Sequence, residues 1–318
     1  MPSGLPDLTD LPPGYVVWRE PRGVAAVSER HAAALTALGV TATEDGTLER
    51  SDLHGRRPLL EYRLADTTLV VRRFHHGGLL RWATGARFRD PARPFDELRV
   101  TEALRAAGFR APHVAGARAR KAPGGGYHLE LWTERIEGAC DVAVLLEDAR
   151  RGALAFPARA RLAAALGSLV ARLHAFGLAH PDLQPRNLLI DRNELEEAAP
   201  LPEPWVLDLD RAELASPPDD GPALTEAQRR HNLRRLFRSV ARRSAEGSAP
   251  FLTRGDLARF AKAYAAAAAR APHGAFPCDW RADWRAIEAA HARRGLAHRV
   301  TRSLERRFGD DRARLGRE

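Results

Sequence analysis

The length, composition and charge of the chain exclude several classes of protein. Its 318 residues are long for one compact core and fit one large domain or two lobes that share a cleft. With 44% hydrophobic and 29% charged residues, and no apolar run near the roughly 20 residues that span a bilayer, we expect neither a disordered polymer nor an integral membrane protein. The formal net charge of +9 favours an anionic partner, such as a nucleotide, a phospholipid surface or a nucleic acid.

The N-terminus and the cysteines indicate a cytoplasmic protein. Residues 1–13 lack the basic region and apolar stretch of a secretory signal. Cys140 and Cys278 are far apart and lack metal-ligand spacing, so we expect neither a disulfide framework nor a zinc site built on cysteines.

The first part of the chain has the pattern of a small lobe rich in β-hairpins. Its helix ends carry clear signals: Ser28 is the expected N-cap and Gly39 the C-terminal stop of one helix, and Pro94 and Gly108 bound another. The predicted elements, in chain order, are two strands at 14–27, a helix at 28–39, strands at 59–64 and 68–74, a helix at 94–108, and a hairpin turning at 124–126 whose second strand is 127–134.

The composition becomes strongly helical after residue 138, so we place the lobe boundary near 134–139. This gives an N-lobe at 1–136 and a C-lobe at 137–318. The helices expected in the C-lobe are 159–177, which Gly177 caps, 225–243, 253–270 and 280–294, followed by an arginine-rich amphipathic tail at 295–318.

Two segments of the C-lobe carry residues suited to phosphoryl transfer, HPDLQPRN (180–187) and WVLDLD (205–210). This chemistry needs a carboxylate that orients and deprotonates the attacking hydroxyl, and oxygen ligands for the cation that bridges the phosphates. Asp182 fits the first role, and Asn187 and Asp208 fit the second. Singly, Asp182 is also typical of a turn or a helix cap and Asn187 of an Asx turn, but the order H-x-D-x-x-x-x-N followed by D-x-D is long and specific.

The sequence resembles the protein-kinase-like superfamily and, within it, the lipopolysaccharide core kinases, in particular the 3-deoxy-D-manno-octulosonic acid (Kdo) kinases. The resemblance spans roughly residues 15–243 and is carried by VVRRFHHGGLL (70–80), PFDELRVTEAL (94–104), LWTERIEGA (131–139), HPDLQPRNLLID (180–191) and VLDLDRAEL (206–214). It implies an α+β, bilobal fold with a small antiparallel β-sheet and one main helix in the N-lobe, and a mostly α-helical C-lobe.

In the catalytic segments, the resemblance implies that Asp182 is the catalytic aspartate and that Asn187 and Asp208 bind Mg²⁺. Asp210 takes the glycine position of the motif that reads DFG in protein kinases, as in the Kdo-kinase pattern D-x-D-R. His180 is expected to anchor the loop through a hydrogen bond rather than to transfer a proton.

The resemblance also predicts the nucleotide-binding residues. Arg72 stands where protein kinases have a phosphate-binding lysine, with Glu97 as the first choice for its ion-pair partner and Glu102 as the second. A glycine-rich phosphate loop is expected before residue 59, but the chain offers only HGRRP (54–58), where backbone amides around Gly55 could cover the phosphates. Glu134 and Ile136 lie in the expected hinge, which reads adenine through backbone groups.

The resulting hypothesis is an ATP- and Mg²⁺-dependent kinase that phosphorylates a sugar hydroxyl of the lipopolysaccharide inner core, on Kdo or a neighbouring sugar of this glycolipid. The segment HHGGLL (75–80) and the absence of an APE-type activation segment favour it over a protein kinase. The basic tail fits peripheral contact with an anionic inner membrane leaflet and equally fits a solvated helix face.

Two alternatives remain open. One is a kinase of the aminoglycoside or choline type, although arginine-rich lobes argue against the acidic acceptor pocket that it needs. The other is a nucleotide-binding pseudokinase. Arg72 in place of lysine and the lack of a glycine-rich loop favour it, whereas the presence of Asp182, Asn187 and Asp208 together argues against it. No nucleic-acid partner is expected, because the net charge is the only feature that would support one and no nucleic-acid-binding module is recognised.

Overall fold

A computed structural model of the chain describes residues 4–53, 59–75, 86–197, 200–215, 224–244 and 252–271, and single residues between 275 and 285. The expected phosphate loop with Gly55, most of HHGGLL and the basic tail lie outside the described residues. The chain divides into two compact units. The first comprises Met1–Asp148 and His180–Leu214, and the second comprises Ala149–Ala179 and Ala215–Glu318.

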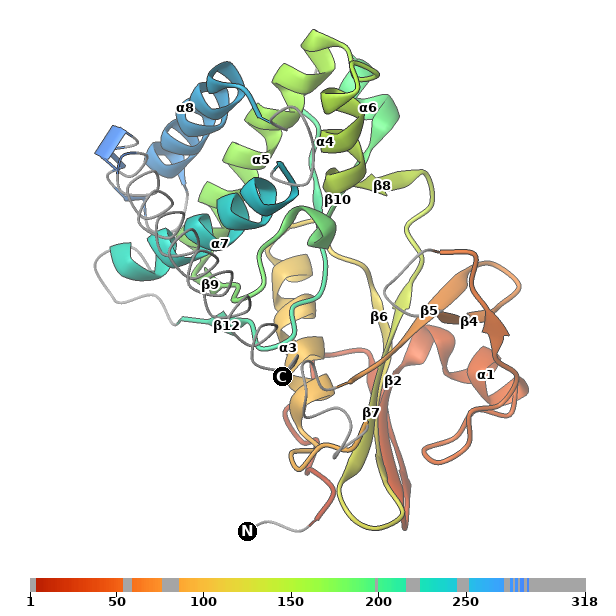
Figure 1. The fold of residues 1–318 in the computed structure, drawn as a ribbon. Helices are drawn as coiled ribbons and strands as arrows, with labels where there is room; N and C mark the ends of the chain where they lie inside the picture. Colours follow the sequence, from red (N-terminus) through yellow and green to blue (C-terminus); the bar gives the residue numbers. More distant parts are fainter. Residues whose placement is uncertain are drawn as a thin grey trace, which may run out of the picture. The chain divides into compact units, whose positions relative to one another are not determined.

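A seven-stranded antiparallel sheet forms the centre of the first unit (Figure 1). Its strand order is β1-β2-β6-β7-β5-β4-β3. The strands are β1 (Tyr15–Glu20), β2 (Gly23–Ser28), β3 (Glu49–Arg50), β4 (Leu60–Arg63), β5 (Thr68–Arg73), β6 (Val114–Lys121) and β7 (Tyr127–Glu134). The strands predicted at 14–27 and at 59–64 and 68–74 therefore pair as hairpins, and the hairpin predicted to turn at 124–126 is present.

The two faces of this sheet bury separate apolar clusters, because successive side chains of a strand point to opposite faces. On β2, Val24 and Ala26 pack with Phe95 and Leu98 of helix α3 (Arg93–Ala106). Ala25 and Val27 pack on the other face with Leu35 of helix α1 (Glu29–Ala37). The two helices accordingly cover opposite faces of the sheet (Figure 1).

Helix α3 confirms the prediction made from its local signals. It has a proline in its first turn, and it buries Phe95, Leu98, Thr101 and Leu104, which follow one another at the three-residue spacing of neighbouring positions on a helix surface. Ser28 does precede α1, as predicted, but its side chain makes no capping hydrogen bond. Its hydroxyl lies instead 3.0 Å from His113 Nε2.

Three short strands hold the segments that carry the phosphoryl-transfer motifs. They form a second antiparallel sheet of β11 (Trp205–Val206), β10 (Leu188–Asp191) and β8 (Ala139–Asp141). The sequence analysis missed β8 and β10, because strands of three or four residues have too little periodicity to detect. Nearby elements are α4 (Val142–Arg150), a 3-10 helix (Pro185–Asn187), α6 (Arg192–Glu196) and β12 (Glu213–Leu214).

The second unit is mainly helical. It contains α5 (Phe156–Phe176), β9 (Leu178–Ala179), α7 (Glu226–Ser244) and α8 (Arg254–Arg270). Gly177 ends α5 at a φ of 95°, as predicted, and Thr253 and Asp256 form a capping box at the start of α8. The expected helix at 280–294 lies largely outside the described residues.

The α+β class is therefore confirmed, with an antiparallel sheet and one main helix in one unit and helices in the other. Within the part of the chain that the structure describes, no helix combines the length and apolar character needed to cross a membrane.

Candidate active site

The segment His180–Asn187 forms a loop closed by its own hydrogen bonds. Asn187 Nδ2 donates to the Asp182 carbonyl oxygen at 3.0 Å, and the Asn187 N–H donates to Gln184 O at 2.9 Å. The side chain of Asn187 is buried. Because its Nδ2 is engaged, the orientation of the amide is set, and its oxygen is the atom that a cation could bind.

Strand pairing brings Asp208 next to this loop. Leu188, directly after Asn187, pairs with Val206, and the Leu207 N–H donates to Asn187 O at 2.8 Å. Asp208 then adopts a φ of 55°, in the left-handed region that non-glycine residues rarely occupy. Such a conformation is often retained where it aims a functional side chain.

Arg72 on β5 joins Asp208 to the main helix of the sheet. Its Nη1 donates to Asp208 Oδ1 at 2.5 Å, and its Nη2 donates to Oε2 of Glu97 on α3. The guanidinium also lies 4.5 Å from the centroid of the Phe74 ring. A planar fork can bridge two carboxylates at fixed angles, which a lysine ammonium cannot do in the same way.

Burial and neighbouring charges determine the protonation states of Glu97 and Arg72. Glu97 is 3% exposed, and burial raises its pKa to about 7, with Arg72 opposing the shift and Asp208 adding to it. Burial disfavours the charged form of Arg72, but the Glu97 and Asp208 carboxylates outweigh it and raise the pKa of Arg72. Arg72 therefore stays a cation, and its side chain remains 31% exposed.

Arg72 pairs with Glu97, which was the first of the two glutamates considered from the sequence. Glu102 instead lies 3.4 Å from His113 Nδ1 and accepts a hydrogen bond from the Val114 N–H. The ion pair predicted between Arg72 and Glu97 is present, and its part in nucleotide binding stays a prediction.

A second arginine–carboxylate pair, which the sequence analysis missed, holds the D-x-D segment. Arg93, the first residue of α3, donates through Nε to Asp210 Oδ1 at 2.5 Å and through Nη2 to Oδ2. Its guanidinium lies 5.4 Å and 5.1 Å from the ring centroids of Phe74 and Phe88. No local pattern in the sequence points to this pair, because Arg93 and Asp210 are 117 positions apart.

Asp182 is partly exposed, as its predicted contact with a substrate requires. Gln184 Nε2 donates to its Oδ2 at 2.9 Å and so orients the carboxylate. Sequence reasoning passed over Gln184, which has no distinctive spacing. His180 is buried, and its carbonyl oxygen accepts the Leu183 N–H at 3.2 Å, within the same loop.

The expected hinge lies at the end of β7. The Glu134 N–H donates to His113 O at 2.9 Å, so that N–H is not available to a nucleotide. The Glu134 side chain turns to His31 and Arg30. Ile136 follows two residues later and is half-buried. Contact of these residues with adenine stays a prediction.

Comparison with known proteins decides the family. The sequence model of the lipopolysaccharide kinase (Kdo/WaaP) family matches residues 51–264. The chain belongs to this family. The match covers the segments that build the site, from Arg72 to Asp208, and the predicted resemblance to lipopolysaccharide core kinases is confirmed. As a member of the Kdo/WaaP family, the protein is a kinase, a phosphotransferase with an alcohol group as acceptor.

Two enzymes with related sequences agree with this assignment. A 3-deoxy-D-manno-octulosonic acid kinase from Actinobacillus succinogenes is 28% identical over 201 residues, which are 61% of this chain and 74% of the relative. The enzyme of the same name from Stenotrophomonas maltophilia (strain K279a) is 31% identical over 199 residues, covering 61% of this chain and 70% of the relative. The solved structure "WaaP in complex with acyl carrier protein" aligns with a TM-score of 0.49 at 20% identity, over 83% of this chain and 91% of that chain.

Proposed function

We propose that this kinase transfers the γ-phosphoryl group of ATP to a sugar hydroxyl of the lipopolysaccharide inner core, on Kdo or a neighbouring sugar attached to lipid A. The observation that carries the proposal is the convergence of Arg72, Asn187 and Asp208 through the Arg72–Asp208 ion pair and the Leu207–Asn187 hydrogen bond. The relatives that are named Kdo kinases support the choice of acceptor.

The side chains fit a magnesium ion at Asn187 and Asp208. The Asn187 amide has its nitrogen engaged and its oxygen left over, and the Asp208 side chain is 37% exposed, with one oxygen on Arg72. Amide and carboxylate oxygens are the ligands that Mg²⁺ prefers. When bound, the ion would neutralise charge on the donor phosphates.

Asp182, Arg72 and Arg93 would each have a separate role in the transfer. Asp182, oriented by Gln184, would accept the proton of the sugar hydroxyl as that oxygen bonds to phosphorus and the bond to ADP breaks. Arg72 would place its positive charge against the donor phosphates while Glu97 holds it. Arg93 would keep the D-x-D segment in position through Asp210.

The test is transfer of label from γ-labelled ATP with Mg²⁺ to Kdo-lipid A in detergent. We expect label in the lipid with the wild type and a loss of about 10²- to 10⁴-fold in Asp182→Ala, because the proton acceptor is removed. Asp208→Asn should be similarly impaired. Asp66→Asn, in the exposed turn between β4 and β5, is the matched control and should keep full activity.

Other outcomes would reject parts of the proposal. If ATP is hydrolysed in an Asp182-dependent way but no label reaches the lipid, the acceptor is wrong. If the protein binds ATP but neither hydrolyses it nor transfers its phosphoryl group, the nucleotide-binding pseudokinase alternative is correct. Membership of the Kdo/WaaP family does not favour the aminoglycoside or choline type of kinase.

We also propose peripheral contact with an anionic membrane leaflet, where the acceptor glycolipid resides. The net charge of +9 supports it, since each basic residue near such a surface contributes about 1 kcal/mol. Co-sedimentation with anionic vesicles, but not with zwitterionic ones, is the expected result.

A further inference from the structure

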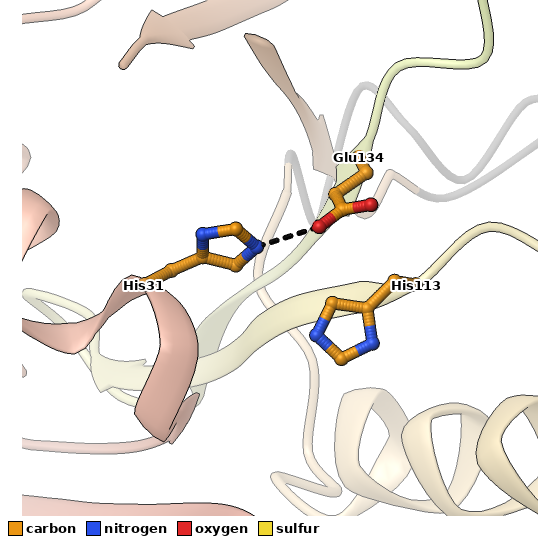
Figure 2. Close-up of side chains that lie close together, drawn as sticks. All are labelled: His31, His113 and Glu134. Carbon is orange, nitrogen blue, oxygen red and sulfur yellow. Dashed lines mark hydrogen bonds and ion pairs between the residues drawn. The ribbon is translucent and has the colours of Figure 1, made fainter. Parts of the chain in front are cut away.

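Two histidines and a glutamate form a cluster in the first unit, apart from the residues proposed for phosphoryl transfer. His31 comes from α1, His113 directly precedes β6, and Glu134 ends β7 (Figure 2). One ligand atom from each residue lies within 4.8 Å of those of the other two. His31 Nε2 is 2.8 Å from Glu134 Oε1, and the two imidazole centroids are 5.7 Å apart.

The surroundings of His113 match those of a metal-binding histidine. Its Nδ1 faces Glu102 Oε1 at 3.4 Å, and Glu102 is itself held by the Val114 N–H and by Arg105. A histidine that ligates a metal usually donates its other ring N–H to a carboxylate, which fixes the tautomer. This arrangement leaves Nε2 as the electron-pair donor. Ser28 Oγ lies 3.0 Å from that nitrogen, where its hydroxyl can donate.

Burial and charge also suit a bound cation. The His31 side chain is 2% exposed, while those of His113 and Glu134 are 15% and 22% exposed, so the cluster is enclosed but reachable by solvent. Arg30 Nη1 lies 3.1 Å from Glu134 Oε1 and competes for that carboxylate. The Arg30 side chain is 62% exposed, so it can turn into solvent when a cation enters.

We propose that His31, His113 and Glu134 bind a divalent transition-metal ion, with Zn²⁺ as the best match. Two imidazoles and one carboxylate are a common zinc donor set, and a water molecule would complete four-coordination. Ligand atoms around tetrahedral zinc are roughly 3.4 Å apart, as bond lengths near 2.1 Å require, so a small movement of His113 would accompany binding. Mg²⁺ is excluded as the occupant, because it prefers oxygen ligands and dehydrates reluctantly.

A bound ion would connect α1 and the segment before β6 to the end of β7. It would therefore brace the sheet at the segment predicted to act as the hinge. This site is separate from the oxygen ligands Asn187 and Asp208, and it does not depend on the proposed transfer reaction.

The test uses the full-length chain without a histidine tag, stripped with a chelator and then titrated with Co²⁺ as a spectroscopic substitute for Zn²⁺. We expect one equivalent of Co²⁺ to give the visible absorption of a tetrahedral nitrogen–oxygen site, and one equivalent of Zn²⁺ to abolish it. Calorimetric titration with Zn²⁺ then supplies the dissociation constant.

The variants separate this site from adventitious binding. Glu134→Gln and His113→Ala should each weaken Zn²⁺ binding at least about tenfold, because a donor atom is lost or made neutral. Glu134→Gln keeps the side-chain shape and the hydrogen bond to His31, so the fold should persist, as circular dichroism can verify. His128→Ala, on the same strand β7, is the matched control and should bind like the wild type.

Two results would overturn the proposal. One is the absence of a stoichiometric Co²⁺ spectrum in the wild type. The other is Zn²⁺ binding that is unchanged in the folded Glu134→Gln and His113→Ala proteins, which would place the ion elsewhere. Neither readout uses kinase activity, so a failure of the proposed function would leave this test unaffected.

Discussion

At the residue scale, Arg72 connects Glu97 to Asp208, and we expect its removal to destabilise the protein by an amount that depends on pH. Arg72→Ala leaves the buried Glu97 carboxyl without its cation, and we expect the free energy of unfolding to fall by about 3 kcal/mol at pH 8. Glu97 already has a pKa of about 7, above its usual value, so ionising it costs stability as the pH rises through that value. Removing Arg72 raises the pKa of Glu97 further. At pH 6 Glu97 is protonated in the folded variant, so the stability lost in Arg72→Ala should be smaller than at pH 8.

Urea denaturation of the wild type and the variant at both pH values measures this effect. The double variant Arg72→Met with Glu97→Gln is the control, because it leaves no buried carboxylate to be paired. It should recover most of the lost stability. An Arg72→Ala loss that is equal at pH 6 and pH 8 would show that the Glu97 charge is not its cause.

At the element scale, the contact between α5 and α8 reverses the usual effect of replacing a helical glycine. Alanine is normally about 1 kcal/mol better than glycine inside a helix. A Cβ on Gly167 of α5, however, would lie 2.2 Å from the backbone oxygen of Phe260 in α8. We therefore expect Gly167→Ala to lower the free energy of unfolding by about 1–3 kcal/mol, since the two helices must move apart.

Gly255, in the first turn of α8, is the matched control. Its added Cβ would meet the Nη1 atom of Arg259 at 2.9 Å, and that flexible side chain can move away. Gly255→Ala should leave stability unchanged or raise it by up to about 1 kcal/mol in the same urea experiment. A stabilised Gly167→Ala protein would contradict the close approach of α5 and α8.

At the scale of the whole molecule, a buried histidine should make stability depend on pH. His174 Nδ1 lies 2.7 Å from Tyr264 Oη, and its Nε2 lies 3.2 Å from Asn232 Nδ2. Burial, together with the positive charge of Arg229, lowers the pKa of His174 to about 3. The folded protein therefore holds this imidazole neutral, whereas the unfolded chain protonates it near pH 6.5.

The contribution of His174 to stability is complete above pH 6.5 and is lost as the pH falls toward 3. We expect this one group to reduce the free energy of unfolding by up to about 1.4 kcal/mol per pH unit in that range. Denaturation at pH 7, 6 and 5 measures the slope. His174→Gln should flatten it, whereas His231→Gln, exposed on α7, should not. The same slope in His174→Gln and the wild type would assign the effect to other groups.

Local patterns in the sequence were enough to predict the family and several of the helices and their ends. The ordered motifs around Asp182, Asn187 and Asp208 were sufficient to predict the family, because phosphoryl transfer restricts both residue types and spacing. Capping residues and helical periodicity predicted α3, and Gly177 predicted the end of α5, because these signals act within a few residues of the backbone they affect.

The tertiary structure decided which distant side chains meet. Helical spacing turns Glu97 and Glu102 to different sides of α3, but only the packing of α3 on the sheet assigns Glu97 to Arg72 and Glu102 to His113. The Arg93–Asp210 pair and the meeting of His31, His113 and Glu134 likewise had no local signal. Periodicity specifies the residues that share a face, whereas contacts between residues tens of positions apart depend on how the elements pack, which no short pattern encodes.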